Sequence, residues 1–166
     1  MNLSSDIYLP MSQPVDCLLY AGAEMFLNPE VAIIQHSTGV LQVAHDYFEN
    51  GITYFTNTVY RAIRYCVGSG EVAPFVGHNA FLRWKAVQSV GKPDPDGDGY
   101  TCYWSESHVS EDFDIALRLQ MAGNIVRLAH YHNDEFKEGV SLTIYDELAR
   151  WEKYAFCVDH SFRSKF

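Results

Sequence analysis

The chain has 166 residues, of which 48% are hydrophobic and 14% aromatic, and this composition is typical of one folded domain with a substantial core. Its 21 acidic residues outnumber the 12 basic ones, and the formal net charge of -9 opposes contact with a phosphate backbone, so nucleic acid is not expected as a partner. Four widely spaced cysteines without a CxxC pair indicate neither a zinc ribbon nor a disulfide framework.

The first half of the chain is predicted to alternate between helix and strand. A helix over 15–26 follows Pro14, a strand over 31–36 comes next, and a long helix extends from about residue 45 to residue 67. Along the long helix, apolar residues recur at spacings of three and four and form a stripe on one face. The stripe consists of Phe48, Ile52, Phe55, Val59, Ile63 and Cys66.

The second half continues this alternation. A strand over 79–83 leads into a short helix that stops near Gly91, and a polar turn follows at 93–100. A helix from about Ser110 to Gly123 precedes a strand over 124–129. One face of this helix carries Phe113, Ala116, Leu117 and Met121. A capping box of Thr143 and Asp146 is predicted to open a last helix, whose apolar stripe comprises Ile144, Leu148, Trp151 and Ala155.

Two adjacent carboxylates stand at the start of the helix that follows Ser110. A structural interpretation explains them, because Ser110 is a good N-cap and acids in the first turn meet the positive end of the helix dipole. A functional interpretation is also open. Glu111 or Asp112 at a helix mouth stays ionised at neutral pH and is able to accept a proton from a ligand in a cleft beyond the helix.

Two groups of residues have some of the features of a metal site. Asp94, Asp96 and Asp98 alternate as in the first half of a calcium loop, but Ser105 occupies the position that should carry a bidentate glutamate. His130 and His132 share one face of a strand and His108 lies upstream, yet no cysteine or carboxylate stands at ligand spacing. A solvated turn and a strand edge are therefore expected here, and no metal ligand is assigned.

Two further short motifs have both a structural and a functional interpretation. Trp151 fits the apolar stripe of the last helix, and Arg150 beside it would lie at the edge of that face, where a guanidinium is able to clamp a diphosphate. Gly77 either lets the backbone turn before a strand or permits close approach of a ligand.

Taken in chain order, these motifs resemble the second half of the catalytic domain of family 2 glycosyltransferases, the group that includes cellulose and hyaluronan synthases. The likeness is nearest to uncharacterised fungal members. It is carried by PEVAIIQH at 29–36, FVGHNAFLRW at 75–84, SEDFDIALRL at 110–119, and EGVSLT at 138–143 leading to DELARW at 146–151. The resemblance implies an α/β fold, a partial GT-A-type domain over 14–166 with helices on a partial mixed sheet, preceded by an unmatched segment at 1–13.

The resemblance also implies roles for individual residues. Asp112 would be the catalytic base that deprotonates an acceptor hydroxyl, with support from Glu111. Arg150 would meet the leaving diphosphate and Trp151 would lie under the acceptor, although Glu147 replaces the family's glutamine. The acceptor path would be lined by Gly77, His78 and Asn79.

Family members also have a nucleotide-binding half that ends in an AspXaaAsp motif, which binds Mg²⁺ or Mn²⁺ and the diphosphate of a UDP-sugar. Residues 1–13 contain Asp6 without a partner at that spacing, so no competent donor site is expected within this sequence, and the chain is expected to be inactive alone. An incomplete sheet would expose an apolar face and favour self-association.

The complete family protein is expected at the cytoplasmic face of a membrane, whereas this sequence shows neither a signal peptide nor the roughly 18 apolar residues of a membrane span. The leading hypothesis is therefore a fragment of an inverting glycosyltransferase that transfers a hexose from a nucleotide sugar to a glycan acceptor. Two alternatives remain open at this point: a non-catalytic remnant that binds a glycan or an intact synthase, and a small metal-binding module.

Overall fold

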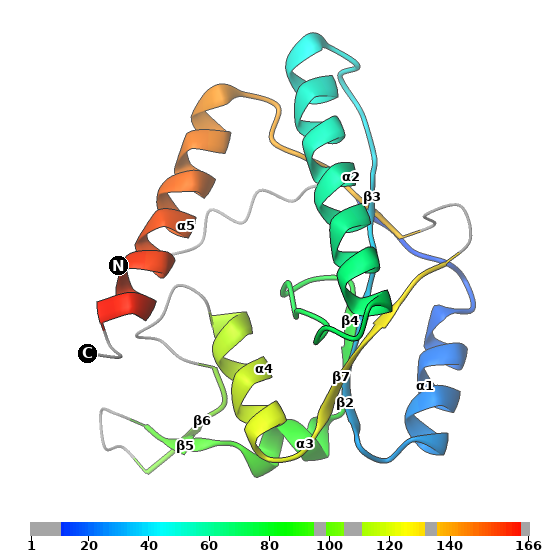
Figure 1. Ribbon diagram of the computed structural model, residues 1–166, viewed down its shortest axis with the longest axis vertical. Helices are drawn as coiled ribbons and strands as arrows, with labels where there is room; N and C mark the ends of the chain where they lie inside the picture. The colour runs from blue at the N-terminus through cyan, green and yellow to red at the C-terminus, as the bar shows by residue number, and fades with distance from the viewer. Residues whose placement is uncertain (1–10, 95–98, 105–110, 132–135, 164–166) are drawn as a thin grey trace.

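The structure is a computed structural model, and it describes residues 11–94, 99–104, 111–131 and 136–163. A three-stranded mixed sheet lies at its centre, in the strand order β4-β2-β7 (Figure 1). The middle strand β2 (Val31–His36) pairs antiparallel with β4 (Ala80–Leu82) and parallel with β7 (Ile125–Ala129). The predicted α/β class, with helices on a small mixed sheet, is confirmed.

Helices cover both faces of β2. On one face, α1 (Cys17–Leu27) places Ala21 against Val31 and Ile34. On the other face, a larger core joins Ile33 to α3 (Trp84–Ser89), α4 (Glu111–Met121) and the segment before β4. Coverage on both faces explains why the first four residues of β2 form an uninterrupted apolar run rather than an alternating pattern.

Smaller elements surround this centre. β1 (Met11–Ser12), β8 (Lys137–Glu138) and β3 (Gly39–Val40) form a second sheet in the order β1-β8-β3. β5 (Lys92–Pro93) pairs with β6 (Thr101–Cys102), and α2 (Tyr47–Gly68) contacts β3. The last helix is α5 (Ile144–Arg163). Its predicted capping box is confirmed, because Thr143 Oγ1 accepts from the Asp146 N–H at 3.2 Å and lies 2.6 Å from Asp146 Oδ2.

A side-chain N-cap, which the sequence analysis did not identify, starts α2. The Asp46 side chain accepts from the Glu49 N–H, and the buried Glu49 carboxylate accepts from the N–H groups of Val43, Ala44 and His45. Burial raises the pKa of Glu49, but these three backbone donors outweigh it and hold the pKa below its ordinary value. Glu49 therefore fixes the approach of the chain to α2 as an ionised group.

The buried face of α4 differs from the predicted one. The residues that face the core are Ile115, Ala116 and Leu119, whereas Phe113, Leu117 and Met121 are exposed. Apolar residues occur around most of this helix, so spacing alone did not identify the side that packs on the sheet. The correction matters for the site, because Asp112 precedes Ile115 and Ala116 by three and four residues and therefore lies on the core-facing side.

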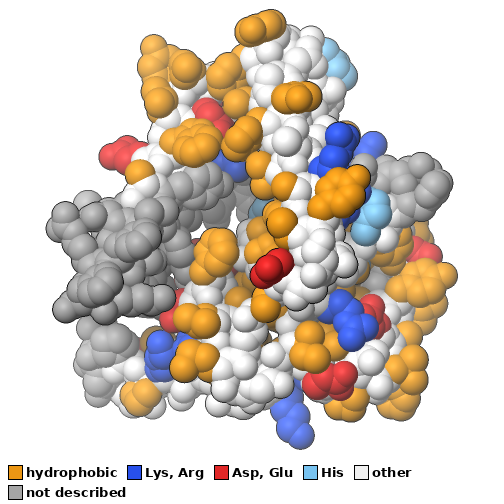
Figure 2. All heavy atoms as spheres, in the orientation of Figure 1, with side chains coloured by type: hydrophobic (Ala, Val, Ile, Leu, Met, Phe, Trp, Pro, Cys, Tyr) orange, Lys and Arg blue, Asp and Glu red, His pale blue; other side chains and the backbone are white. Residues whose placement is uncertain are grey.

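Two other predicted stripes are largely uncovered by the described residues. On α2 the buried residues are Glu49 and Tyr60, while Phe55 and Val59 of the stripe are exposed. On α5 the exposed residues include Ile144, Leu148 and Trp151. Figure 2 shows hydrophobic side chains gathered over α2 and the first turns of α5. Within the described ranges, no helix combines the length and apolar character needed to cross a bilayer.

Candidate functional site

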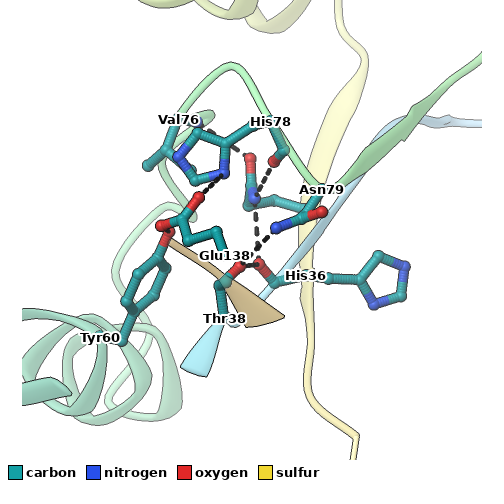
Figure 3. A network of polar contacts seen from close by, with 8 residues as sticks. His36, Thr38, Tyr60, Val76, His78, Asn79 and Glu138 are labelled. Atoms are coloured by element: carbon teal, nitrogen blue, oxygen red, sulfur yellow. Dashed lines mark hydrogen bonds and ion pairs between the residues drawn. The ribbon is translucent and has the colours of Figure 1, made fainter. Parts of the chain in front are cut away.

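The candidate site lies at the carboxyl end of β2. Because β2 and β7 are parallel, their carboxyl ends meet at one edge of the sheet, where open α/β sheets place their ligands. Three other segments reach this edge: the loop at 75–79, the start of α4, and β8. The polar contacts that join most of these segments are drawn in Figure 3.

Gln35, which is almost completely buried in β2, holds the loop in place. Its Nε2 donates to the carbonyl oxygens of His78 at 2.9 Å and His36 at 3.0 Å, and its Oε1 accepts from the Val76 N–H at 3.0 Å. A buried amide whose donor and acceptor are both satisfied adds rigidity to the segment that it joins. The backbone on both sides of Gly77 is therefore tied to the central strand.

Gly77 lies directly against Asp112. Its φ of +86° is in the left-handed region, and a Cβ added to it would lie 2.2 Å from Asp112 Oδ2 and 2.6 Å from Asp112 Cγ. A side chain at this position would have to adopt a left-handed backbone conformation and would also displace the Asp112 carboxylate. The loop and the start of α4 are thus brought together with the Asp112 carboxylate between them.

The three acids at the start of α4 have different surroundings. Asp114 pairs with Arg118, with its Oδ2 at 2.9 Å from both Nε and Nη2. Glu111 is half-buried in the first turn. Asp112 lies on the core-facing side of α4, and its carboxylate faces the loop at 75–79. A helix start explains Glu111 by itself, but it does not explain why the Asp112 carboxylate lies against the loop. Ser110, the predicted N-cap, lies outside the described residues.

His78, the next residue of the loop, lies within ion-pair distance of Glu138 on the other side of the site. Its Nδ1 lies 2.9 Å from Glu138 Oε2 on β8, and the Tyr60 hydroxyl of α2 lies 3.5 Å from Glu138 Oε1. Figure 3 shows the His78 ring and the Glu138 carboxylate pointing toward each other from different segments. Asn79, also named as a candidate, donates from Nδ2 to Thr38 Oγ1 at 3.2 Å and has a left-handed φ of 49°. Its side chain therefore ties the loop to the chain after β2.

Three of the candidates lie together on α5. Glu147 Oε1 accepts from Trp151 Nε1 at 2.9 Å, and Glu147 Oε2 lies 3.6 Å from Arg150 Nη1. Arg150 Nη1 also lies 3.5 Å from Ser141 Oγ, and the Trp151 ring is 5.9 Å from that of Phe55 on α2. Trp151 is 49% exposed, so the interpretation of this residue as core is wrong.

The structure brings several of the predicted site residues into contact. Gly77 lies against Asp112 and precedes His78, and Glu147 contacts both Arg150 and Trp151 on α5. Sequence reasoning missed Gln35 and Glu138. A signal existed for Gln35, because it is a polar residue that directly follows the four apolar residues of a strand buried on both faces.

Beside the site, His36 occupies an aromatic enclosure. It is 2% exposed, its ring stacks on Phe136 with centroids 4.2 Å apart, and Phe81 and Tyr131 lie at 5.6 Å. Neither ring nitrogen has a hydrogen-bond partner among the residues that the structure describes, and burial lowers the pKa of His36 from 6.5 to about 4. The imidazole is therefore neutral in the folded protein.

This burial makes the stability of the fold dependent on pH. When the pH falls from about 6.5 to about 4, the unfolded chain binds a proton at His36 that the folded chain does not bind, so stability decreases. We expect the free energy of unfolding to drop by about 3 kcal/mol more in the native chain than in His36→Leu, since one pKa unit corresponds to about 1.4 kcal/mol. Denaturant unfolding near neutral pH and near pH 4 measures this difference, and equal losses in the two proteins would contradict it.

The metal candidates receive no support from the described residues. No group of three His, Cys, Asp or Glu side chains able to hold a cation occurs among them. His130 lies 2.9 Å through Nε2 from Arg64 Nη1, while Asp96, Asp98, His108 and His132 lie outside the described ranges. The free cysteines in the described part are Cys17, Cys66 and Cys102.

Comparison with known protein families identifies the chain. A family model described as glycosyl transferase family group 2 matches residues 12–166. The chain belongs to this family. No curated protein and no solved structure matches it. Membership of glycosyl transferase family group 2 establishes glycosyl transfer as the general chemistry, with a nucleotide sugar as donor and a separate acceptor in the complete enzyme. The helices and mixed sheet agree with a GT-A-type domain.

Proposed function

We propose that these residues form the acceptor side of an inverting glycosyltransferase that transfers a hexose from a UDP-sugar to a glycan. The observation that carries this proposal is the position of Asp112. Its carboxylate lies on the core-facing side of α4, against Gly77, at the edge of the sheet where ligands bind.

In the proposed reaction, an acceptor hydroxyl oxygen attacks the anomeric carbon of the donor sugar. Its proton passes to the Asp112 carboxylate, the bond from that carbon to the diphosphate breaks, and the bonding electrons leave with the diphosphate. Attack from the side opposite the leaving group inverts the configuration. Glu111, one residue before the base, supports Asp112 by adding negative charge beside it.

Positive charge is needed where the diphosphate departs, and Arg150 is the proposed source. In the structure Glu147 holds both Arg150 and Trp151, which presents a half-exposed ring that suits a sugar face. Gly77, His78 and Asn79 would line the acceptor path. Mg²⁺ or Mn²⁺ is proposed as the metal of the complete protein, which would act at the cytoplasmic face of a membrane.

The test is transfer by the complete protein that carries these residues. UDP-glucose and UDP-N-acetylglucosamine are supplied as donors, with cello- and chito-oligosaccharides as acceptors, and the anomeric configuration of the product is read by NMR. We expect a β-linked product from the α-linked donor. An α-linked product would refute inversion. Oligosaccharide binding without any transfer would refute the enzymatic assignment.

A further inference from the structure

We propose that Glu138 is a positioning residue of the acceptor site. Its carboxylate holds the His78 ring by Nδ1, so that Nε2 is available to hydrogen-bond a hydroxyl group of the bound sugar beside Asp112. The inference rests on the proposed function, because it names a further group that would orient the same acceptor.

The protonation pattern of the ring follows from its partner. Glu138 Oε2 lies 2.9 Å from His78 Nδ1, and an ionised carboxylate only accepts hydrogen bonds. At this separation the carboxylate favours the neutral tautomer with its proton on Nδ1, and in that tautomer Nε2 is a hydrogen-bond acceptor. Among the described residues, Nε2 has no hydrogen-bond partner recorded, so this nitrogen is available to a ligand.

The backbone and the ring of His78 are held by different parts of the fold. Its carbonyl oxygen accepts from buried Gln35, while its ring is held by Glu138. Glu138 is itself anchored, because its carbonyl oxygen accepts from the Leu41 N–H at 2.8 Å and its Oε1 lies 3.5 Å from the Tyr60 hydroxyl. The imidazole thus has one orientation set by the central sheet, the small sheet and α2.

The exposures of the His78 and Glu138 side chains indicate a role in ligand binding rather than in packing. The His78 side chain is 40% exposed, whereas that of Glu138 is 16% exposed, so the carboxylate lies inside and the ring lies at the surface. His36 shows the contrasting case, in which a ring that serves packing is enclosed by aromatic residues. A half-exposed ring with a fixed orientation gains little from packing, but it is suited to contact a polar ligand.

The location of the ring connects it to the proposed base. His78 follows Gly77, whose backbone contacts the Asp112 carboxylate, so Asp112 and the ring flank the same short loop. Sugars present several hydroxyl groups on neighbouring carbons. A second fixed hydrogen-bonding group near the base would therefore determine which hydroxyl faces Asp112.

The first arm of the test needs no ligand. Long-range NMR correlations of the ring nitrogens report the tautomer of His78, recorded at a pH high enough to keep the ring neutral. We expect the proton on Nδ1 in the native chain and a mixture of tautomers in Glu138→Gln, because an amide both donates and accepts. Glu30→Gln, a matched exposed change at the other end of β2, should leave the tautomer unaltered. A proton on Nε2 in the native chain would overturn the proposal.

The second arm measures acceptor binding in the complete protein. Glu138→Gln and His78→Ala are each expected to raise the KM for the oligosaccharide about tenfold, the effect of one lost hydrogen bond, with the KM for the donor unchanged. The double variant should be no worse than His78→Ala, because Glu138 acts through the ring. Additive losses, or equal losses for donor and acceptor in correctly folded variants, would overturn the positioning role.

The two proposals fail in distinguishable ways. Activity that depends on Asp112 but not on Glu138 refutes only this inference. If the complete protein transfers no sugar, the proposed function fails, and NMR titration of the chain with the same oligosaccharides decides the inference separately. Shifts at the His78 ring that disappear in Glu138→Gln would support it, and an unperturbed His78 ring would overturn it.

Discussion

Asp112→Asn is expected to lower the rate of sugar transfer by about two to four orders of magnitude, because an amide has the shape of the carboxylate but does not accept the acceptor's proton. The fold should be retained, since asparagine fits the same space beside Gly77. The measurement is the turnover number of the complete protein with a UDP-sugar donor, compared at equal amounts of folded protein.

The matched control is Asp114→Asn, two residues along the same helix. Asp114 pairs with Arg118 and lies 3.6 Å from Lys92 Nζ, so this change removes the same charge from α4 and weakens a structural ion pair. We expect lower stability and near-native transfer by the folded fraction. If Asp112→Asn retains full activity, or if both variants lose activity equally, Asp112 is not the base.

Gly77→Ala should abolish most of the transfer without a correspondingly large loss of stability. A methyl group at Gly77 would meet the Asp112 carboxylate at 2.2 Å, and the nearest atoms belong to the end of a side chain that is able to rotate away. The expected result is a displaced carboxylate in an otherwise folded protein. Displacement of a base by about 1 Å is enough to cost roughly a hundredfold in rate.

Gly123→Ala is a closely matched control for this change. Gly123 also has a φ of +86°, but a Cβ there would meet nothing within 4 Å. Both variants should therefore lose about 1 kcal/mol of unfolding free energy from the left-handed backbone, while only Gly77→Ala loses transfer. Denaturant unfolding and turnover of both variants test this expectation. Full activity in Gly77→Ala would show that the contact with Asp112 has no catalytic role.

Local signals in the sequence predicted much of the fold. The order of helices and strands, the Thr143 and Asp146 capping box, and the start of α4 at Glu111 depend on residues close together in the chain. The family was also recognisable, because several ordered motifs span most of the chain. Such features do not require knowledge of how distant segments pack.

The features that were missed depend on long-range contacts. The buried side of α4 is determined by the sheet beneath it, so the exposed Phe113 and Leu117 were wrongly placed in the core. Glu138 was visible in the sequence, but its contact with His78 spans two segments whose proximity depends on the small sheet. Gly77 was recognised as ambiguous, and its steric role became apparent only when α4 was placed opposite it.

The departure at Glu147 illustrates a third kind of limit. The sequence showed that an acid replaces the family's glutamine, and this placed the acceptor contact in doubt. In the structure the acid bonds to Trp151 and pairs with Arg150, so the charge of the guanidinium is partly balanced within the helix. Residue type indicated the change of charge, but only the geometry showed which side chains it affects.

The most direct measurement is a crystal structure of the protein with a bound acceptor oligosaccharide. The expected result is one sugar hydroxyl oxygen within about 2.6–3.2 Å of the Asp112 carboxylate, at the edge of the sheet formed by the loop that contains Gly77. A sugar bound at a different surface, with the Asp112 carboxylate contacting only Gly77 and its own helix, would contradict the assignment of Asp112 as the base.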